Sequence, residues 1–268
     1  MSRPARVLAL ANQKGGVAKT TTTLNLGVAL HDMGARVLAI DLDPQSNLSM
    51  SQGIDVESLD LGMYHVLTGQ AALSEIITPR EIDIAPAGIE LAGAELALSA
   101  MIGRERALQR ALRPLLEVYD YVLLDTPPSL GLLTINAMVA ADGVIVPVQC
   151  EYLSLRGLAQ LRQTLTQVRE NLNPDVDIVG ILPTMYDGRT MHGRDAVALL
   201  EESFGDRVYR TRVGKTIRFA EAPVQGKSVM RYDPNGHAAR WYRQLAREVA
   251  ATEGGRTERV AAGHGTSA

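Results

Sequence analysis

The chain has 268 residues, of which 46% are hydrophobic and 21% charged, and its formal net charge is −3. These values are typical of a globular protein with a sizeable core, and the length suits one large α/β domain better than two ordinary ones. The single cysteine, Cys150, excludes an internal disulfide and predicts a reducing, cytoplasmic location. Apolar runs fall short of the roughly 20 residues that span a bilayer, so we expect no membrane partner.

Short apolar stretches alternate with amphipathic ones along the chain. The expected strands are Val7–Ala11, Val37–Ile40, Ile82–Ala85, Tyr121–Leu124, Gly143–Val148 and Val179–Leu182, with a further candidate at Val208–Tyr209. The expected helices include Thr21–Met33, Glu95–Leu116, Leu155–Asn171 and Gly236–Thr252. Several strands are apolar throughout, which is typical of a sheet covered on both faces, so the pattern predicts an α/β fold with a doubly wound, mostly parallel sheet flanked by helices. We expect one domain over residues 1–252 and a disordered tail over 253–268.

The first expected strand leads into a loop that contains glycines and lysines, and a helix follows. Such a loop can surround phosphate oxygens with backbone N–H groups at the helix N-terminus. The standard pattern G-x-x-x-x-G-K-[ST] fails, because Gln13 and Ala18 stand at its glycine positions. The loop fits the variant K-G-G-x-x-K-[ST], in which Lys19 reaches the β and γ phosphates and the Thr20 hydroxyl binds Mg²⁺. The expected nucleotide contacts in the loop are Lys14, Gly15, Gly16, Val17, Ala18, Lys19, Thr20 and Thr21.

Carboxylates follow two further expected strands. Asp41 and Asp43 come after the second strand, and Asp125 comes directly after Tyr121–Leu124. The carboxyl ends of parallel strands border the crevice in which such sheets bind ligands. Four apolar residues followed by aspartate is also the Walker B arrangement, in which Asp125 would hold Mg²⁺ through water. For Asp43, which precedes a proline, ordinary turn chemistry is the alternative.

Positive charge is concentrated between Gly205 and Arg247. This segment contains ten Lys or Arg residues and three acidic ones, a local charge of +7, which leaves −10 for the rest of the chain. Either the cations belong to solvated helix faces, or they form a surface that binds a polyanion.

The loop sequence KGGVAKTT resembles the deviant Walker A motif of the ParA/MinD family of dimeric P-loop ATPases. The strings D-x-D-P-Q from Asp41 and DTPPS from Asp125 resemble the switch I and switch II segments of that family. The resemblance implies a P-loop NTPase fold, ATP and Mg²⁺ as cofactors, and an ATP-dependent homodimer in which Lys14 reaches the phosphates of the partner. It further implies that Asp43 positions the attacking water and that Asp41 supports Mg²⁺ through water.

By this resemblance the catalytic residues are Lys14, Lys19 and Asp43, and the metal-site residues are Thr20, Asp41 and Asp125. The stretch from Pro183 to Asp187 is similar to the one that flanks adenine in relatives. Pro183 and Met185 are therefore candidate adenine contacts, with simple packing as the alternative.

Within the family the chain is most similar to the short ParA/Soj type. The segments 185–190 and 218–223 look like Soj segments, whereas a lone cysteine argues against Fe–S relatives. The glycine-rich C-terminus argues against a MinD-like membrane helix. Thirteen residues before Lys14 leave no room for the helix-turn-helix domain of larger plasmid ParA proteins.

This type implies a chromosome or plasmid partition ATPase with slow intrinsic turnover. Its ATP-bound dimer would bind double-stranded DNA without sequence preference, on the nucleoid, until a ParB-like partner stimulates hydrolysis. The expected DNA contacts are Arg189, Lys215, Arg218 and Lys227, although Soj proteins usually have Arg where this chain has Lys215. The alternatives are a spatial regulator that positions a protein or organelle cargo, and a metabolic P-loop ligase.

Overall fold

A computed structural model describes residues 4–150 and 155–263. In these residues eight strands form one sheet, in the order β3-β4-β2-β5-β1-β6-β7-β8. The strands are β1 (Arg6–Leu10), β2 (Val37–Asp41), β3 (Thr78–Pro79), β4 (Asp83–Ala85), β5 (Tyr121–Asp125), β6 (Gly143–Gln149), β7 (Ile178–Tyr186) and β8 (Val213–Gly214). All neighbours pair in parallel except the edge hairpin β3–β4. The predicted doubly wound, mostly parallel α/β fold is therefore confirmed.

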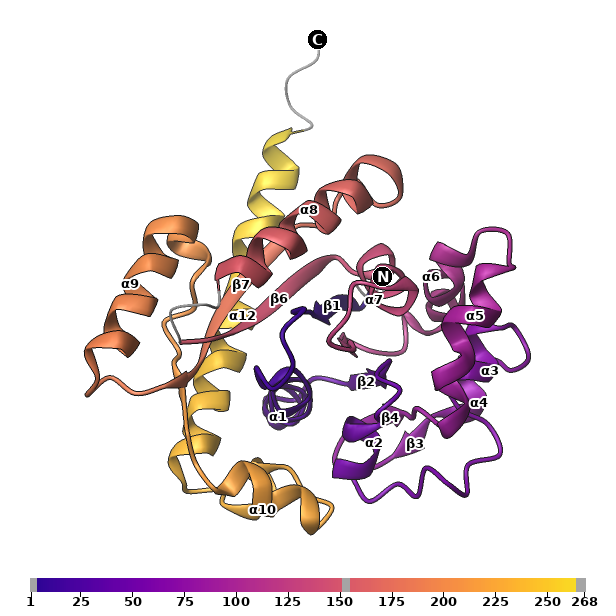
Figure 1. The fold of residues 1–268 in the computed structure, drawn as a ribbon, viewed down its shortest axis with the longest axis horizontal. Helices are drawn as coiled ribbons and strands as arrows, with labels where there is room; N and C mark the ends of the chain where they lie inside the picture. Colours follow the sequence, from indigo (N-terminus) through magenta and orange to yellow (C-terminus); the bar gives the residue numbers. More distant parts are fainter. Residues whose placement is uncertain (1–3, 151–154, 264–268) are drawn as a thin grey trace.

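Alternation along the central strands sends successive side chains to opposite faces of the sheet. Val7 and Ala9 of β1 belong to one hydrophobic cluster, together with buried residues of α7 (Leu132–Ala140) and α8 (Leu155–Asn171). Leu8 and Leu10 belong to a second cluster, together with buried residues of α1 (Lys19–Asp32) and α12 (His237–Gly263). Each face is thus covered by helices, and in Figure 1 α8 lies above β6 and α1 below it.

The remaining helical elements are mostly short, apart from the 14-residue α9. The α-helices among them are α2 (Asn47–Ser51), α3 (Met63–Leu67), α4 (Leu73–Ile76), α5 (Ala94–Ser99), α6 (Ala107–Leu112), α9 (Met191–Phe204), α10 (Arg218–Val224) and α11 (Val229–Tyr232). The 3₁₀ turns are η1 (Ile89–Gly93), η2 (Arg104–Arg106), η3 (Arg113–Leu115) and η4 (Gly205–Arg207).

The single helix predicted over Glu95–Leu116 is wrong. The chain instead forms α5, η2, α6 and η3 in succession. Gly103 adopts a left-handed φ of +66°, which turns the chain between α5 and η2, and Pro114 stands at the start of η3. Both residues interrupt a regular helix, because one leaves the helical φ region and the other lacks a backbone N–H donor.

Other boundaries also differ from the predicted ones, among them that of β7, which runs to Tyr186 rather than to Leu182. Val208 makes an isolated parallel bridge to Ile181, and the edge strand β8 lies further along the chain at Val213–Gly214. The last helix passes the predicted end at Thr252 and continues to Gly263. Glutamate, arginine and alanine in this extension favour helix, and no proline stops it. Of the predicted tail, residues 264–268 lie outside the described ones, and a domain boundary at 252 stays a prediction.

The last helix packs against the helix that follows the phosphate loop. Tyr242 of α12 is fully buried, and its hydroxyl lies 3.2 Å from Thr22 Oγ1 of α1. Asn25 Oδ1 of α1 accepts a hydrogen bond from the Val229 backbone N–H at 2.8 Å. The C-terminal part of the chain therefore packs against one side of α1.

Over the described residues, no helix is long and apolar enough to cross a membrane.

Candidate nucleotide site and basic surface

The phosphate loop joins β1 to α1 in a tight turn. Gly16 and Ala18 both have left-handed φ angles, +70° and +72°. This conformation is ordinary for glycine but costs energy for alanine, and such residues cluster at functional sites. Lys14, Gly15 and Gly16 are exposed, whereas Val17 is buried. The loop therefore presents its lysine and glycines outward while Val17 fixes it to the core.

Two polar side chains that are not part of the K-G-G-x-x-K-[ST] motif hold the loop in place. Asn12 donates to the Pro147 carbonyl of β6 at 2.7 Å and accepts from the Lys14 backbone N–H at 3.0 Å. Thr184 of β7 donates to the Val17 carbonyl at 3.1 Å. Sequence reasoning missed both roles, although a polar residue in an apolar strand, as at Thr184, is a usable signal.

Lys19, at the start of α1, points into the protein rather than into solvent. Its side chain is 7% exposed, and Nζ lies 3.5 Å from the Lys14 carbonyl oxygen. Burial lowers the pKa of Lys19, and the charges of Asp125 and Asp43 oppose that shift. The ammonium group thus lies between the glycine loop and the acidic strand ends, where phosphate oxygens would complete its charge balance.

Asp41 and Asp125 end the neighbouring strands β2 and β5 and are paired in register. Both are fully buried. Burial raises the pKa of each carboxyl group, and for Asp125 the adjacent charge of Asp41 adds to the shift. Asp41 Oδ2 accepts from the Ser49 N–H at 2.9 Å and from its hydroxyl at 2.7 Å. Hydrogen-bond donors of the protein therefore fix the Asp41 carboxylate, while the Asp125 carboxylate has fewer hydrogen-bond partners.

Asp125 has the features of a residue that faces a cation. Oδ1 accepts from Thr23 Oγ1 at 3.2 Å, and Oδ2 is buried without a hydrogen-bond partner in the described part of the chain. A hydrogen bond from Thr20 lowers the pKa of Asp125, against the effect of burial. A buried, unpartnered carboxylate oxygen next to a hydroxyl fits a hydrated Mg²⁺.

Protein carboxylates alone do not form a metal cage here. Within residues 4–150 and 155–263, no group of three or more His, Cys, Asp or Glu could hold a metal ion. Mg²⁺ in nucleotide sites commonly uses one or two protein ligands together with phosphate oxygens and water. The hydroxyl of Thr20 and the carboxylate of Asp125 fit that mode.

Asp43 lies in the turn that follows β2. Its Oδ1 accepts from the Gln45 N–H at 3.0 Å, and its own N–H donates to Asp41 Oδ1 at 3.1 Å. The side chain is 8% exposed. The turn chemistry that was the alternative interpretation is thus present. It occupies one oxygen and holds the carboxylate near Lys19, whose pKa it influences.

The candidate adenine contacts lie on the C-terminal half of β7. Pro183 is buried and pairs in register with Val148 of β6. Met185 is half-buried and has a left-handed φ of +53°. A left-handed φ is uncommon for a residue other than glycine, and such residues cluster at functional sites. Adenine contact by Pro183 and Met185 stays a prediction.

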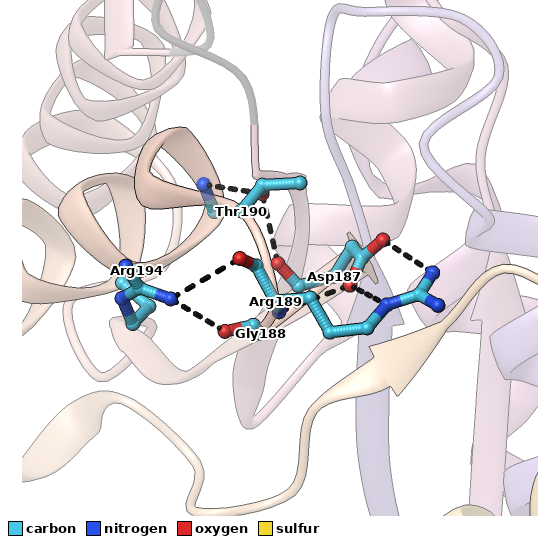
Figure 2. Close-up of polar contacts among 6 residues, drawn as sticks. Asp187, Gly188, Arg189, Thr190 and Arg194 are labelled. Atoms are coloured by element: carbon cyan, nitrogen blue, oxygen red, sulfur yellow. Dashed lines mark hydrogen bonds and ion pairs between the residues drawn. The ribbon is translucent and has the colours of Figure 1, made fainter.

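The predicted DNA contact Arg189 lies in the turn between β7 and α9. Its guanidinium donates from Nε and Nη2 to the two carboxylate oxygens of Asp187, at 2.9 and 2.8 Å, as Figure 2 shows. Arg194 donates to the carbonyls of Gly188 and Arg189 at 2.9 and 3.3 Å (Figure 2). Thr190 Oγ1 accepts from Gly193 N–H at 3.1 Å and so caps α9. The turn is therefore well ordered, and sequence reasoning missed Asp187 and Arg194 as its organisers.

Of the other predicted DNA contacts, Lys215 and Lys227 are exposed. Lys227 borders a hollow of about 30 Å³ that Thr20 and Thr21 also line, which places it beside the start of α1. Arg218 opens α10 and is paired with Glu221 and Asp233. The four cations therefore come from different loops and helix ends rather than from one helix.

The charge of +7 counted between Gly205 and Arg247 overstates the unpaired positive charge. Several of its arginines are matched by carboxylates from outside that segment. These ion pairs are Arg207–Asp177 at 3.0 Å, Arg212–Glu201 at 2.5 Å and Arg231–Asp32 at 2.6 Å. Some of these cations are therefore structural and others face solvent, and polyanion binding by the exposed ones stays a prediction.

A lysine-rich loop between strand and helix, facing carboxylates at the ends of β2 and β5, defines the class of P-loop nucleotide-binding proteins. Comparison with known proteins narrows the class. Residues 5–178 match the family model described as AAA domain. Soj of Bacillus subtilis, the sporulation initiation inhibitor protein, is 46% identical over 92% of this chain and 98% of its own. The chromosome-partitioning ATPase Soj of Thermus thermophilus is 47% identical over 92% and 96%.

Among solved structures, cobyrinic acid a,c-diamide synthase from Mycobacterium smegmatis, with a bound ATP analogue and magnesium, is 42% identical. It covers 92% of this chain and 94% of its own, with a TM-score of 0.84. The chain belongs to the ParA/Soj family of P-loop ATPases, and the resemblance drawn from the phosphate loop and the acidic strings is confirmed.

Proposed function

We propose that this protein is an ATP-dependent partition ATPase whose nucleotide-bound dimer binds DNA. The observation that carries the proposal is the convergence of Lys19, Asp43 and Asp125 at the carboxyl ends of β1, β2 and β5. Family membership supports partition as the process that this site serves. ATP and Mg²⁺ are the proposed cofactors, because the donor set around Asp125 fits a hydrated Mg²⁺ and the loop fits phosphates.

Each residue of the site has a proposed task. The loop N–H groups and Lys19 bind phosphate oxygens, while Asp43 orients the attacking water. Bound Mg²⁺ would supply charge neutralisation between the β and γ phosphates. Lys14, exposed at the loop's outer side, would reach the nucleotide of a second subunit, so hydrolysis would depend on dimerisation.

The proposed ligand of the basic surface is double-stranded DNA. Arg189, Lys215, Arg218 and Lys227 are exposed, come from separate loops and helix ends, and suit phosphate contacts better than base reading. A ParB-like partner that stimulates hydrolysis, and a cytoplasmic, nucleoid-associated location, belong to the same proposal by family membership.

The test is DNA binding and oligomeric state with ATP, with ADP and without nucleotide. We expect dimers and DNA binding with ATP only. Equal DNA affinity in the ATP and ADP states would contradict the proposal and favour a cargo-positioning protein. ATP turnover that depends on a small organic acid and an amine donor, rather than on DNA and a partner protein, would favour a metabolic ligase, as the name of the M. smegmatis relative suggests.

A further inference from the structure

Carboxylates pair with both arginines among the four cations that we expect to contact DNA. Asp187 pairs with Arg189 through both of its oxygens and also accepts the Arg189 backbone N–H at 3.0 Å (Figure 2). These hydrogen bonds lower the pKa of Asp187 to about 2, and the positive charge of Lys215 contributes. Asp187 therefore pairs with Arg189 and also attracts Lys215 at longer range, without an ion pair between them among the described contacts.

Arg218 shows the same arrangement at a different place in the chain. Its Nη1 lies 2.7 Å from Glu221 Oε2, and its Nε lies 3.6 Å from Asp233 Oδ2. The Tyr232 hydroxyl donates to Glu221 Oε2 at 3.1 Å, which keeps that carboxylate in position. For Lys227, the described residues provide no ion pair.

Ion pairs at such exposed positions are weak, because water and salt screen them. The Arg189 side chain is 90% exposed although it is paired. A DNA phosphate can therefore displace the carboxylate from the guanidinium. The displaced carboxylate cannot move far, because Thr190 and Arg194 bind the backbone of the same turn. It then stays close to the bound phosphate and repels it.

We propose that Asp187, together with Glu221 and Asp233, competes with DNA phosphates for the two arginines. This competition lowers the DNA affinity of each subunit. The inference deepens the proposed function and rests on it. Low affinity per subunit makes binding depend on two subunits acting together. Release after the dimer separates is then fast, because each single subunit holds DNA weakly.

The test compares Asp187→Asn with Glu202→Gln in duplex-DNA titrations with ATP. Both changes remove one negative charge, but Glu202 is exposed on α9 and has no ion pair among the described residues. A unit charge about 5 Å from a phosphate in water changes affinity about fourfold. With two subunits we expect Asp187→Asn to bind on the order of tenfold more tightly, and Glu202→Gln to match the wild type. Glu221→Gln should also tighten binding.

ATP-driven dimerisation, measured by light scattering, should be unchanged in all variants and serves as the check on folding. Weaker binding by Asp187→Asn would show that Asp187 presents Arg189 to DNA rather than competing for it, and would overturn the inference. Equal tightening by Glu202→Gln would also overturn it, since net charge alone would then explain the gain. If the wild-type protein binds no DNA in any nucleotide state, the proposed function is wrong as well. If the wild type binds DNA and the variants behave in one of the two ways just described, only the inference is wrong.

Discussion

Thr184 in β7 donates a hydrogen bond to the carbonyl oxygen of Val17, 167 positions away in the phosphate loop, at 3.1 Å. Thr184 is fully buried, and its own carbonyl accepts from the Cys150 N–H at 3.0 Å. One strand residue therefore fixes the position of the loop that surrounds the phosphates. The candidate adenine contacts Pro183 and Met185 flank it on the same strand.

Thr184→Val should weaken this attachment without changing side-chain volume. The Val17 carbonyl would lose its partner, at a cost of about 1–3 kcal/mol in the free energy of unfolding. We also expect weaker nucleotide binding, because the loop is less fixed. Thermal unfolding with and without ATP measures both effects. Thr184→Ser, which keeps the hydroxyl but loses the buried methyl group, is the control for nucleotide binding. A valine variant as stable as the wild type would show that the hydrogen bond contributes nothing.

The two loop lysines should differ in their effects. Lys19→Ala should abolish ATP binding, because buried Lys19 is the cation that faces the acidic strand ends. Lys14→Ala should keep much of the nucleotide affinity but lose ATP-driven dimerisation and stimulated hydrolysis. Fluorescence binding and light scattering separate the two steps. Normal dimerisation and turnover by the Lys14 variant would remove Lys14 from the proposed role across the dimer.

Asp43→Ala should trap an ATP-bound dimer. The phosphate-binding groups remain, while the group that orients water is gone, and such positioning is worth about two to four orders of magnitude in rate. Steady-state phosphate release, with dimerisation as the folding check, measures the change. Hydrolysis at the wild-type rate would assign water positioning to another residue and leave Asp43 as a turn residue that binds the Gln45 N–H.

Charge reversal on the basic surface should remove DNA binding and spare the nucleotide site. We expect Arg218→Glu, and more weakly Arg189→Glu, to act in this way. Each phosphate contact adds about −0.9 to the slope of log affinity against log salt, so losing one contact per subunit should reduce the slope of a dimer by about two. Titrations across a salt series measure the slope. Salt-insensitive binding by the wild type would contradict phosphate contacts altogether.

The effect of Asp187 on DNA binding should not depend on pH between 5 and 8. Without DNA its pKa is lowered to about 2 by the Arg189 hydrogen bonds. When a phosphate displaces it from Arg189 the carboxyl group loses these bonds, and the ordinary aspartate pKa is still below this range, so the carboxylate stays charged. The pair is present above the ordinary aspartate pKa and is lost only as pH falls towards 2. The ratio of wild-type to Asp187→Asn affinity should therefore stay flat. A ratio that approaches one near pH 5 would show that Asp187 takes up a proton there.

The fold was predictable because its core strands are apolar and its loops carry specific signals. The central strands around Val7 and Val122 lie in the predicted places, since short apolar runs bounded by turn residues favour buried strands. The helix over Glu95–Leu116 failed because its periodic apolar residues continue through Gly103, where a positive φ turns the chain. Helical periodicity does not reveal such a turn when apolar residues recur at helical spacing on both sides of it.

The site was predictable where chemistry requires particular residues in a fixed spacing. Lys19 and Asp125 have that property, and the structure places them close to each other. The roles of Asn12 and Thr184 were missed because each binds a residue far away in the sequence, Pro147 and Val17 respectively. The order of strands in the sheet brings these partners together, and the sequence does not show that order. The unpaired positive charge of the basic segment was overestimated for the same reason, since carboxylates from distant parts of the chain, such as Asp32, pair with its arginines.

The contact between Tyr242 and Thr22 has a consequence for synthesis on the ribosome. Helix α1 carries the phosphate-binding loop at its start, yet one of its faces is covered by α11 and α12, which are made after every described strand of the sheet. Until these helices emerge, the apolar residues Leu26 and Leu30 of α1 lack part of their cover. A nascent chain therefore holds an incompletely covered helix behind its nucleotide site until α11 and α12 have been made.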